Sequence, residues 1–389
     1  GKRGDRPRGS PAPGPAVREG SVRQGARGRW PSGMLLGADS RLPSLPPPAR
    51  RGYDPRMSDA HRRRLVVTGQ VQGVGFRPFV YRLAARRELT GLVRNSPEGV
   101  VVEVQGPADA VAGFEAALET ELPPLARITG LERDDMGPVS GEEGFAILKS
   151  EAGAGHNVLI SPDIAACADC LADMADPDGR RFEYPFTNCT NCGPRWTITR
   201  SIPYDRPVTS MACFEMCPDC RAEYEDPLDR RFHAQPNACP ACGPEVWLAG
   251  PDGTESARSG EALAGLAKRL LPASGTGQVA AVKGLGGFHL ACDATDASAV
   301  AALRRRKGRP HKPLAVMVPD LNAARALARV DGAEAAWLAG ARRPIVLLDR
   351  RPDCALCTGV SPDTDLVGLM LPYTPLHHVL MKRAREALE

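Results

Sequence analysis

The stretch TGQVQGVGFRP, residues 68–78, places three glycines and an arginine between two patterned segments. The preceding RRRLVVTG, residues 62–69, predicts a strand, and the apolar residues of FRPFVYRLAARREL, residues 76–89, recur at helical spacing. Glycines at such a junction let successive backbone N–H groups face one concavity at the helix N-terminus, where the helix dipole adds partial positive charge. Arg77 adds a planar set of donors that matches phosphate oxygens. The stretch predicts an anion cradle, and a plain glycine-rich turn is the alternative.

The residues that follow continue a mixed pattern of strands and helices. TGLVRNSPEGVVVEVQG, residues 90–106, alternates apolar and polar residues around the turn SPEG and predicts a hairpin. ADAVAGFEAALETEL, residues 108–122, predicts an amphipathic helix, and residues 126–135 and 144–150 predict closing strands. The resulting order, βαββαβ, is the ferredoxin-like pattern.

Residues 62–150 resemble an acylphosphatase domain, whose signature is the VQGVGFR loop followed by an asparagine after the second strand, here Asn95. The resemblance implies that Arg77 clamps a phosphoryl group and that Asn95 orients the attacking water. The phosphate loop that it implies consists of Gln72, Gly73, Val74, Gly75 and Phe76. Positioning and charge stabilisation can supply most of the catalysis in such a reaction, without a covalent nucleophile. A cradle that binds phosphate without hydrolysing it is the alternative.

A second region is an internal duplication. Residues 167–192 and 217–242 match in register 50 positions apart, including Asp176-Pro177 with Asp226-Pro227 and Arg180-Arg181-Phe182 with Arg230-Arg231-Phe232. Each copy has the spacing C-x2-C-x18-C-x2-C. The eight cysteines are Cys167, Cys170, Cys189, Cys192, Cys217, Cys220, Cys239 and Cys242.

This spacing predicts two structural zinc ions, because two C-x2-C turns complete a tetrahedron and leave no position for water. Redox-active pairs are the alternative. The spacing leaves the pairing open: each copy binds its own ion, or the outer turns share one ion and the inner turns the other. Cys213 has no counterpart in the first copy, and Cys292 is expected to be a buried thiol. Cys354 and Cys357 form a further C-x2-C without a second pair, so a third metal site is not expected there.

The third region has α/β order. A helix is expected over 257–271, a strand, glycine turn and strand over 277–294, a buried strand over 313–318, a helical stretch over 321–340 and a strand over 344–350. RRRKGRPHKPLAVMV, residues 304–318, concentrates basic residues before a strand, which suits an anionic ligand, although a solvated basic loop has the same composition. The string resembles the nucleotide-binding YrdC/Sua family, and the resemblance assigns phosphate or carbamoyl contacts to Lys307, Arg309 and Lys312, with Lys283 as a further candidate.

Charge is distributed unevenly along the 389 residues. Residues 1–56 carry twelve basic and four acidic side chains, whereas the remainder carries 38 basic and 42 acidic ones. This first segment is rich in Gly, Pro, Arg and Ser and is expected to be disordered. Met57 directly precedes the first patterned segment, and we expect the natural protein to begin there; a functional basic tail over residues 1–56 is the alternative. The mildly acidic remainder argues against nucleic acid as a partner. The sequence has no membrane span and no secretory signal, so we expect a cytoplasmic protein.

The order of these three regions resembles the HypF family of hydrogenase maturation carbamoyltransferases over about residues 62–389, and GLMLPYTPLHHVL, residues 368–380, is also similar to that family. The resemblance implies an α+β multidomain fold: a ferredoxin-like acylphosphatase domain, a zinc-finger-like module and an α/β YrdC-like domain. The domains expected are a disordered basic extension over 1–58, the acylphosphatase-like domain over 59–150, the duplicated zinc module over 160–248 and a C-terminally incomplete YrdC-like nucleotide-binding domain over 257–389.

The same resemblance implies a reaction sequence. Carbamoyl phosphate is hydrolysed to carbamate, which ATP with Mg activates as carbamoyl adenylate, and the carbamoyl group passes to the C-terminal cysteine of the partner HypE to supply cyanide ligands of nickel–iron hydrogenase. The family's transfer domain has no counterpart in the sequence, so we expect an incomplete chain whose own activity stops at carbamoyl phosphate hydrolysis.

The alternative from another functional class is a zinc-stabilised RNA- or protein-binding module of the tRNA-modification type. A salt-dependent affinity for RNA would favour it, whereas release of phosphate from carbamoyl phosphate, lost in Arg77→Ala, would favour the enzyme.

Overall fold

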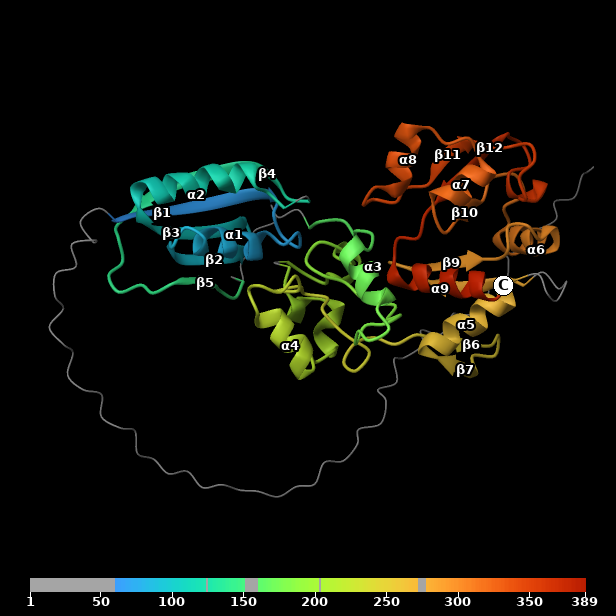
Figure 1. Cartoon of the computed structure of the whole chain (residues 1–389), viewed down its shortest axis with the longest axis horizontal. Coiled ribbons are helices and arrows are strands. Elements are labelled where there is room, and N and C mark those ends of the chain that lie inside the picture. The colour runs from blue at the N-terminus through green and yellow to red at the C-terminus, as the bar shows by residue number, and fades with distance from the viewer. Residues whose placement is uncertain (1–59, 124, 151–159, 203, 272–277) are drawn as a thin grey trace, which may run out of the picture. The chain divides into compact units, whose positions relative to one another are not determined.

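The computed structural model describes residues 60–123, 125–150, 160–202, 204–271 and 278–389 (Figure 1). The basic extension expected to be disordered, residues 1–58, lies outside the described residues. Within the described part of the chain, every helix is too short or too polar to cross a bilayer.

The first region is a single sheet with two helices, drawn in blue to blue-green in Figure 1. Its elements are β1 (Ala60–Gln70), α1 (Phe76–Ala85), β2 (Thr90–Ser96), β3 (Gly99–Pro107), α2 (Ala108–Thr120), β4 (Arg127–Met136) and β5 (Phe145–Ile147). The strand order is β4-β1-β3-β2-β5, in which β1 is antiparallel to β3 and β4, and β5 runs parallel to β2. This is the ferredoxin-like order that the sequence predicts, with the hairpin at residues 90–106.

The core of this region forms where one face of the sheet meets the two helices. Leu65 and Val67 of β1 and Val102 of β3 are fully buried. Leu83 of α1 and Phe114 of α2 belong to the same apolar cluster. Burying a side chain of this size contributes about 2 kcal/mol. This packing holds the end of β1 next to the start of α1, where the glycine-rich loop lies.

The duplicated region consists mostly of turns around two short helices, α3 (Ala168–Ala175) and α4 (Pro218–Glu225). Three 3₁₀ turns join the copies: η2 (Trp196–Ile198), η3 (Arg206–Val208) and η4 (Ser210–Cys213). The backbone repeats as the sequence does. Glu183 and His233, 50 positions apart, both adopt left-handed φ angles, 50° and 54°. The duplication is therefore one of conformation as well as sequence.

The third region contains three small sheets and five helices among its described residues. The elements are β6 (Trp247–Ala249), β7 (Glu255–Arg258), α5 (Ser259–Leu270), β8 (Ala280–Lys283), β9 (Phe288–Ala291), α6 (Ala297–Lys307), β10 (Ala315–Met317), α7 (Leu321–Leu327), α8 (Gly332–Ala339), β11 (Val346–Asp349), the 3₁₀ turn η6 (Thr358–Val360), β12 (Leu366–Met370) and α9 (Pro375–Glu386). The sheets are β6-β7, β8-β9 and β10-β12-β11, and β10 runs parallel to β12.

Three expectations for this region were wrong in detail. The helical stretch 321–340 is two helices, because the Asp331 side chain accepts from the Glu334 backbone N–H while the Glu334 side chain accepts from the Asp331 N–H, and this capping box starts a new helix. The strand at 313–318 is only half buried: Val316 and Val318 are buried, whereas Ala315 is exposed. Cys292 is likewise partly rather than fully buried.

Candidate active site and metal centres

The predicted anion cradle is a tight loop between β1 and α1. Gly73 and Gly75 have φ angles of 72° and 75°, a conformation that glycine adopts at low cost. Gly75 is the N-cap residue of α1 and has no side chain to accept from the first-turn N–H groups, so these donors can bind an anion. Val74 and Phe76 are buried in the apolar core and anchor the loop. The loop therefore has the backbone expected of a phosphate site.

The polar residues assigned from the sequence surround this loop. Gln72, Arg77 and Asn95 are 1%, 7% and 1% exposed. Gln72 Nε2 donates to the carbonyl oxygens of Ser96 at 3.0 Å and Gly99 at 2.8 Å, and so ties the loop to the β2–β3 hairpin. Arg77 and Asn95 line one cavity together with the loop glycines. The structure brings the residues predicted for this site together.

The duplicated region supplies the other wall of the cavity, which the sequence did not predict. The residues that it contributes are Thr190, Arg195, Tyr204, His233, Ala234 and Gln235. Burial, and then the positive charge of Arg77, lower the pKa of His233 to about 4, so this imidazole is neutral at physiological pH. The wall from the duplicated region thus combines a neutral imidazole with one charged side chain, that of Arg195.

Arg195 and Asp205 are the charged residues of the duplicated region that contact the predicted site. Arg195 is 1% exposed and donates through Nε to the carbonyl oxygen of Gly73. Its other guanidinium nitrogens donate to carbonyl oxygens between Cys189 and Pro194. Asp205 Oδ1 lies 3.0 Å from Arg77 Nη2. Only proximity in the fold identifies these residues, because both lie more than 100 positions from the loop.

The eight predicted cysteine ligands form two separate groups, Cys167, Cys170, Cys189 and Cys192, and Cys217, Cys220, Cys239 and Cys242. Each copy therefore gathers its own four cysteines, which decides the pairing that the spacing left open. The described residues hold groups of three or more potential metal ligands only at these two clusters. Cys292, Cys354 and Cys357 instead pack partly buried against the apolar core of the third region.

The sulfur positions fit zinc. Adjacent Sγ atoms are 3.5–3.8 Å apart in the first cluster and 3.6–3.8 Å apart in the second. A tetrahedron with Zn–S bonds of about 2.3 Å has edges of about 3.8 Å. Four cysteines complete the coordination of such an ion, so both clusters fit structural zinc sites.

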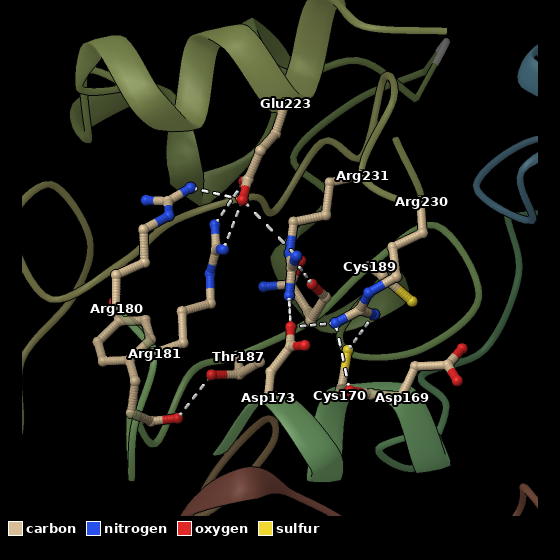
Figure 2. Close-up of polar contacts among 12 residues, drawn as sticks. Asp169, Cys170, Asp173, Arg180, Arg181, Thr187, Cys189, Glu223, Arg230 and Arg231 are labelled. Atoms are coloured by element: carbon tan, nitrogen blue, oxygen red, sulfur yellow. Dashed lines mark hydrogen bonds and ion pairs between the residues drawn. The ribbon is translucent and has the colours of Figure 1, made fainter. Parts of the chain in front are cut away.

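Arginines from each copy donate to a cysteine sulfur of the other copy's cluster. Figure 2 shows one of these contacts, between Arg230 and Cys170. Arg180 Nη1 and Arg181 Nη2 donate to Cys220 Sγ at 3.3 and 3.4 Å. Reciprocally, Arg230 Nη1 donates to Cys170 Sγ at 3.0 Å. A cluster of four thiolates around Zn²⁺ carries a net charge of −2, and these guanidinium groups offset part of it.

Two carboxylates hold the arginines in place, again reciprocally (Figure 2). Glu223 of α4 accepts two hydrogen bonds from Arg181, at 2.8 and 2.7 Å, and pairs with Arg180 at 2.6 Å. Asp173 of α3 pairs with Arg230 and Arg231. Burial would raise the pKa of Glu223, but the hydrogen bonds from Arg181 and Arg180 outweigh it and lower that pKa to about 2. The two copies are therefore joined by ionic contacts in both directions.

The basic residues assigned in the third region come from two places. Lys307 is the last residue of α6, and Arg309 and Lys312 lie in the loop before β10. Arg304, which the sequence did not single out, organises this loop: Nη1 donates to the carbonyl oxygens of Arg309 and Lys312. Lys283 ends β8, and its ammonium nitrogen lies 5.1 Å from the centroid of the Phe288 ring.

Comparison with protein families matches three successive parts of the chain. A family described as acylphosphatase matches residues 63–147, the HypF finger matches residues 166–199 and again 216–249, and a family described under telomere recombination, Sua5_yciO_yrdC, matches residues 273–388.

Curated relatives match across these parts together. The chain is 49% identical over 332 residues to the carbamoyltransferase HypF2 of Cupriavidus necator, covering 85% of this chain and 40% of that protein. It is 52% identical to the carbamoyltransferase HypF of Rhodobacter capsulatus, covering 82% of this chain and 41% of that protein. The chain thus spans about 40% of the length of the curated relatives it matches.

Among solved structures, the chain is similar to one described as the crystal structure of full-length HypF in the phosphate- and nucleotide-bound form. The TM-score is 0.76 at 42% sequence identity, and the match covers 86% of this chain and 42% of that one.

Proposed function

Because the chain belongs to the HypF carbamoyltransferase family, we propose that it carries out the first step of a carbamoyl transfer, the hydrolysis of carbamoyl phosphate to carbamate and phosphate. The loop over residues 72–76 binds the phosphoryl oxygens through backbone N–H groups, and Arg77 balances their charge. Asn95 orients the water that attacks phosphorus. The observation that carries the proposal is the convergence of these buried groups on one cavity.

The later steps of the reaction sequence belong to the same proposal. ATP with Mg activates carbamate as carbamoyl adenylate, with Lys283, Lys307, Arg309 and Lys312 as contacts for phosphate or the carbamoyl group. The carbamoyl group then passes to the C-terminal cysteine of a HypE-type protein in hydrogenase maturation. Two structural zinc ions hold the duplicated region together when they are bound. The cytoplasmic location expected from the sequence remains a prediction.

Phosphate release tests the first step. The zinc-loaded chain is incubated with carbamoyl phosphate, and inorganic phosphate is measured for the wild type, Arg77→Ala, Arg77→Lys and Asn95→Ala. We expect a loss of about 10²-fold or more for Arg77→Ala and for Asn95→Ala. Arg77→Lys keeps the charge without the planar fork and should recover only part of the activity.

The matched control is Arg86→Ala, which removes an exposed arginine paired with Glu121 at the C-terminal end of the same helix. It should leave phosphate release unchanged. No phosphate from the wild type, or equal losses in Arg86→Ala and Arg77→Ala, would overturn the proposal. Pyrophosphate appearing only when ATP and carbamoyl phosphate are both present would support the adenylation step.

A further inference from the structure

Four contacts from the duplicated region converge on the residues that the proposed reaction uses. The Tyr204 backbone N–H donates to Gln72 Oε1 at 3.1 Å, and the Tyr204 carbonyl oxygen accepts from Asn95 Nδ2 at 3.3 Å. Arg77 pairs with Asp205, and Arg195 donates to the Gly73 carbonyl oxygen. These contacts pack the duplicated region against the phosphate loop. They also fix the directions in which the polar groups of Gln72, Asn95 and Arg77 point.

The contact to Asn95 determines which way its amide faces. An asparagine side chain has one acceptor oxygen and one donor nitrogen, and a carbonyl partner selects the nitrogen. Because Nδ2 is used by Tyr204, Oδ1 remains, and it is buried without a hydrogen-bond partner among the described residues. A buried acceptor without a partner is costly unless a ligand or water satisfies it. The arrangement therefore presents an acceptor to a water in the cavity.

The contact to Arg77 fixes the guanidinium in the same manner. Asp205 Oδ1 lies 3.0 Å from Arg77 Nη2, and Asp205 Oδ2 accepts from Ser150 Oγ at 2.6 Å. Both carboxylate oxygens are thus engaged, and the Arg77 side chain is only 8% exposed, against 24% for Asp205. A guanidinium held at one nitrogen keeps its remaining donors in a fixed direction, which is the condition for productive contact with a phosphoryl group.

The same carboxylate has an electrostatic cost for ligand binding. It places a negative charge next to the arginine that must attract a phosphate dianion. Repulsion between this carboxylate and the dianion lowers the affinity for phosphate several-fold, even at a high effective dielectric constant. Asp205 therefore opposes anion binding while it orients the binding group. These two effects have opposite signs on binding and on turnover, so they can be separated by experiment.

We propose that Asp205 is a positioning residue for carbamoyl phosphate hydrolysis: it holds Arg77 in the orientation that the transition state requires, and it weakens the binding of ground-state phosphate. This inference rests on the proposed function. Under this inference, both regions contribute to the anion site. The acylphosphatase-like region supplies the loop, and the duplicated region supplies Tyr204 and Asp205.

The test measures kcat and KM for carbamoyl phosphate and the inhibition constant for inorganic phosphate, using the full zinc-loaded chain. In Asp205→Ala we expect kcat to fall at least about tenfold, while KM does not rise and the phosphate inhibition constant falls about threefold. Asp205→Asn keeps an acceptor oxygen for Arg77 without the charge. It should recover part of kcat and bind phosphate more tightly than the wild type.

Glu215→Gln is the control, because it neutralises an exposed acid of the same region. It should change neither constant. A rise in KM at constant kcat, weaker phosphate inhibition in both Asp205 variants, or the same changes in Glu215→Gln would overturn the inference.

The outcome is distinguishable from failure of the proposed function. If the wild type releases no phosphate, the proposed function fails, and calorimetric titration with inorganic phosphate still tests the electrostatic half of the inference. Tighter binding by Asp205→Asn than by the wild type would support that half, and equal or weaker binding would refute it. A thermal melt of each variant identifies any loss of folding, in which case Asp205→Asn, the smaller change, decides the question.

Discussion

Replacing Glu223 by glutamine removes the carboxylate that holds the arginines between the two copies of the cysteine repeat. Its side chain is 18% exposed, and that of Arg181 is 4% exposed. The pKa of Glu223 is lowered from 4.5 to about 2, which corresponds to about 3 kcal/mol of stabilisation at neutral pH. Glutamine keeps one acceptor oxygen and solvent screens part of the effect, so we expect Glu223→Gln to cost about 2 kcal/mol.

The assay is a urea titration of the zinc-loaded chain at neutral pH, followed by release of zinc to a colorimetric chelator. Glu225→Gln is the matched control, since it lies on the same helix and its pair with Arg221, at 3.8 Å, is exposed. We expect the control to stay within about 0.5 kcal/mol of the wild type. Equal urea midpoints for Glu223→Gln and Glu225→Gln would refute the reasoning.

The pH dependence follows from the same lowered pKa. Because the folded-state pKa lies below the unfolded value, the contribution of Glu223 is present above about pH 4.5 and is lost as the pH falls toward about 2. The difference in stability between the wild type and Glu223→Gln should therefore shrink over this range. A difference that grows on acidification would contradict the assignment.

Three further substitutions test other parts of the structure. Arg230→Gln removes a donor to Cys170 Sγ, and the first cluster should lose zinc to a chelator about tenfold faster, while an unchanged rate would exclude a role for this hydrogen bond in metal retention. Gly73→Ala places a Cβ atom 3.1 Å from Arg195 Cδ at a φ of 72°, so phosphate titration should give at least about tenfold weaker binding. His233→Asn keeps a residue tolerant of left-handed φ and removes an imidazole whose pKa is lowered to about 4. Since the unfolded state takes up this proton below about pH 6.5, the wild type should lose about 2 kcal/mol more than the variant between pH 7 and pH 5, measured by urea unfolding.

Sequence could predict those parts of the molecule whose signal is local. The glycine loop, the hairpin at 90–106 and the cysteine spacing each specify geometry over a short range, and the structure has each of them. The pairing of cysteine turns within each copy required the fold, because the spacing fits both arrangements. The contacts of Arg180 and Arg230 with the opposite cluster have no local sequence signal either.

The residues that sequence reasoning missed act over long separations. Tyr204 and Asp205 lie in an irregular segment without a motif, and 128 positions separate Asp205 from its partner Arg77. The division of 321–340 into two helices did have a local signal, since Asp331 and Glu334 have the spacing of a capping box. The helical pattern on both sides of this capping box nevertheless favours one continuous helix.

The duplication is not symmetric where the copies meet their neighbours in the chain. Position 195, directly after Cys-Gly-Pro in the first copy, is a buried arginine that donates to the phosphate loop at Gly73. The equivalent position in the second copy is Glu245, which accepts from Arg258 at 2.7 Å and Ser259 at 2.9 Å, where the third region begins. The same turn therefore links each copy to a different flanking region through a side chain of opposite charge.

The contacts of Arg195 and Glu245 differ in burial, and this difference sets how much each contributes to stability. Arg195 satisfies carbonyl oxygens at the first zinc cluster and at the phosphate loop, so its replacement by alanine leaves several buried acceptors without donors, at about 1–3 kcal/mol each. Glu245 and Arg258 are 44% and 57% exposed, and solvent screens an ion pair of that kind, so it contributes little to stability. Arg195→Ala should consequently destabilise the protein more than Glu245→Ala, which urea unfolding of the two zinc-loaded variants can measure.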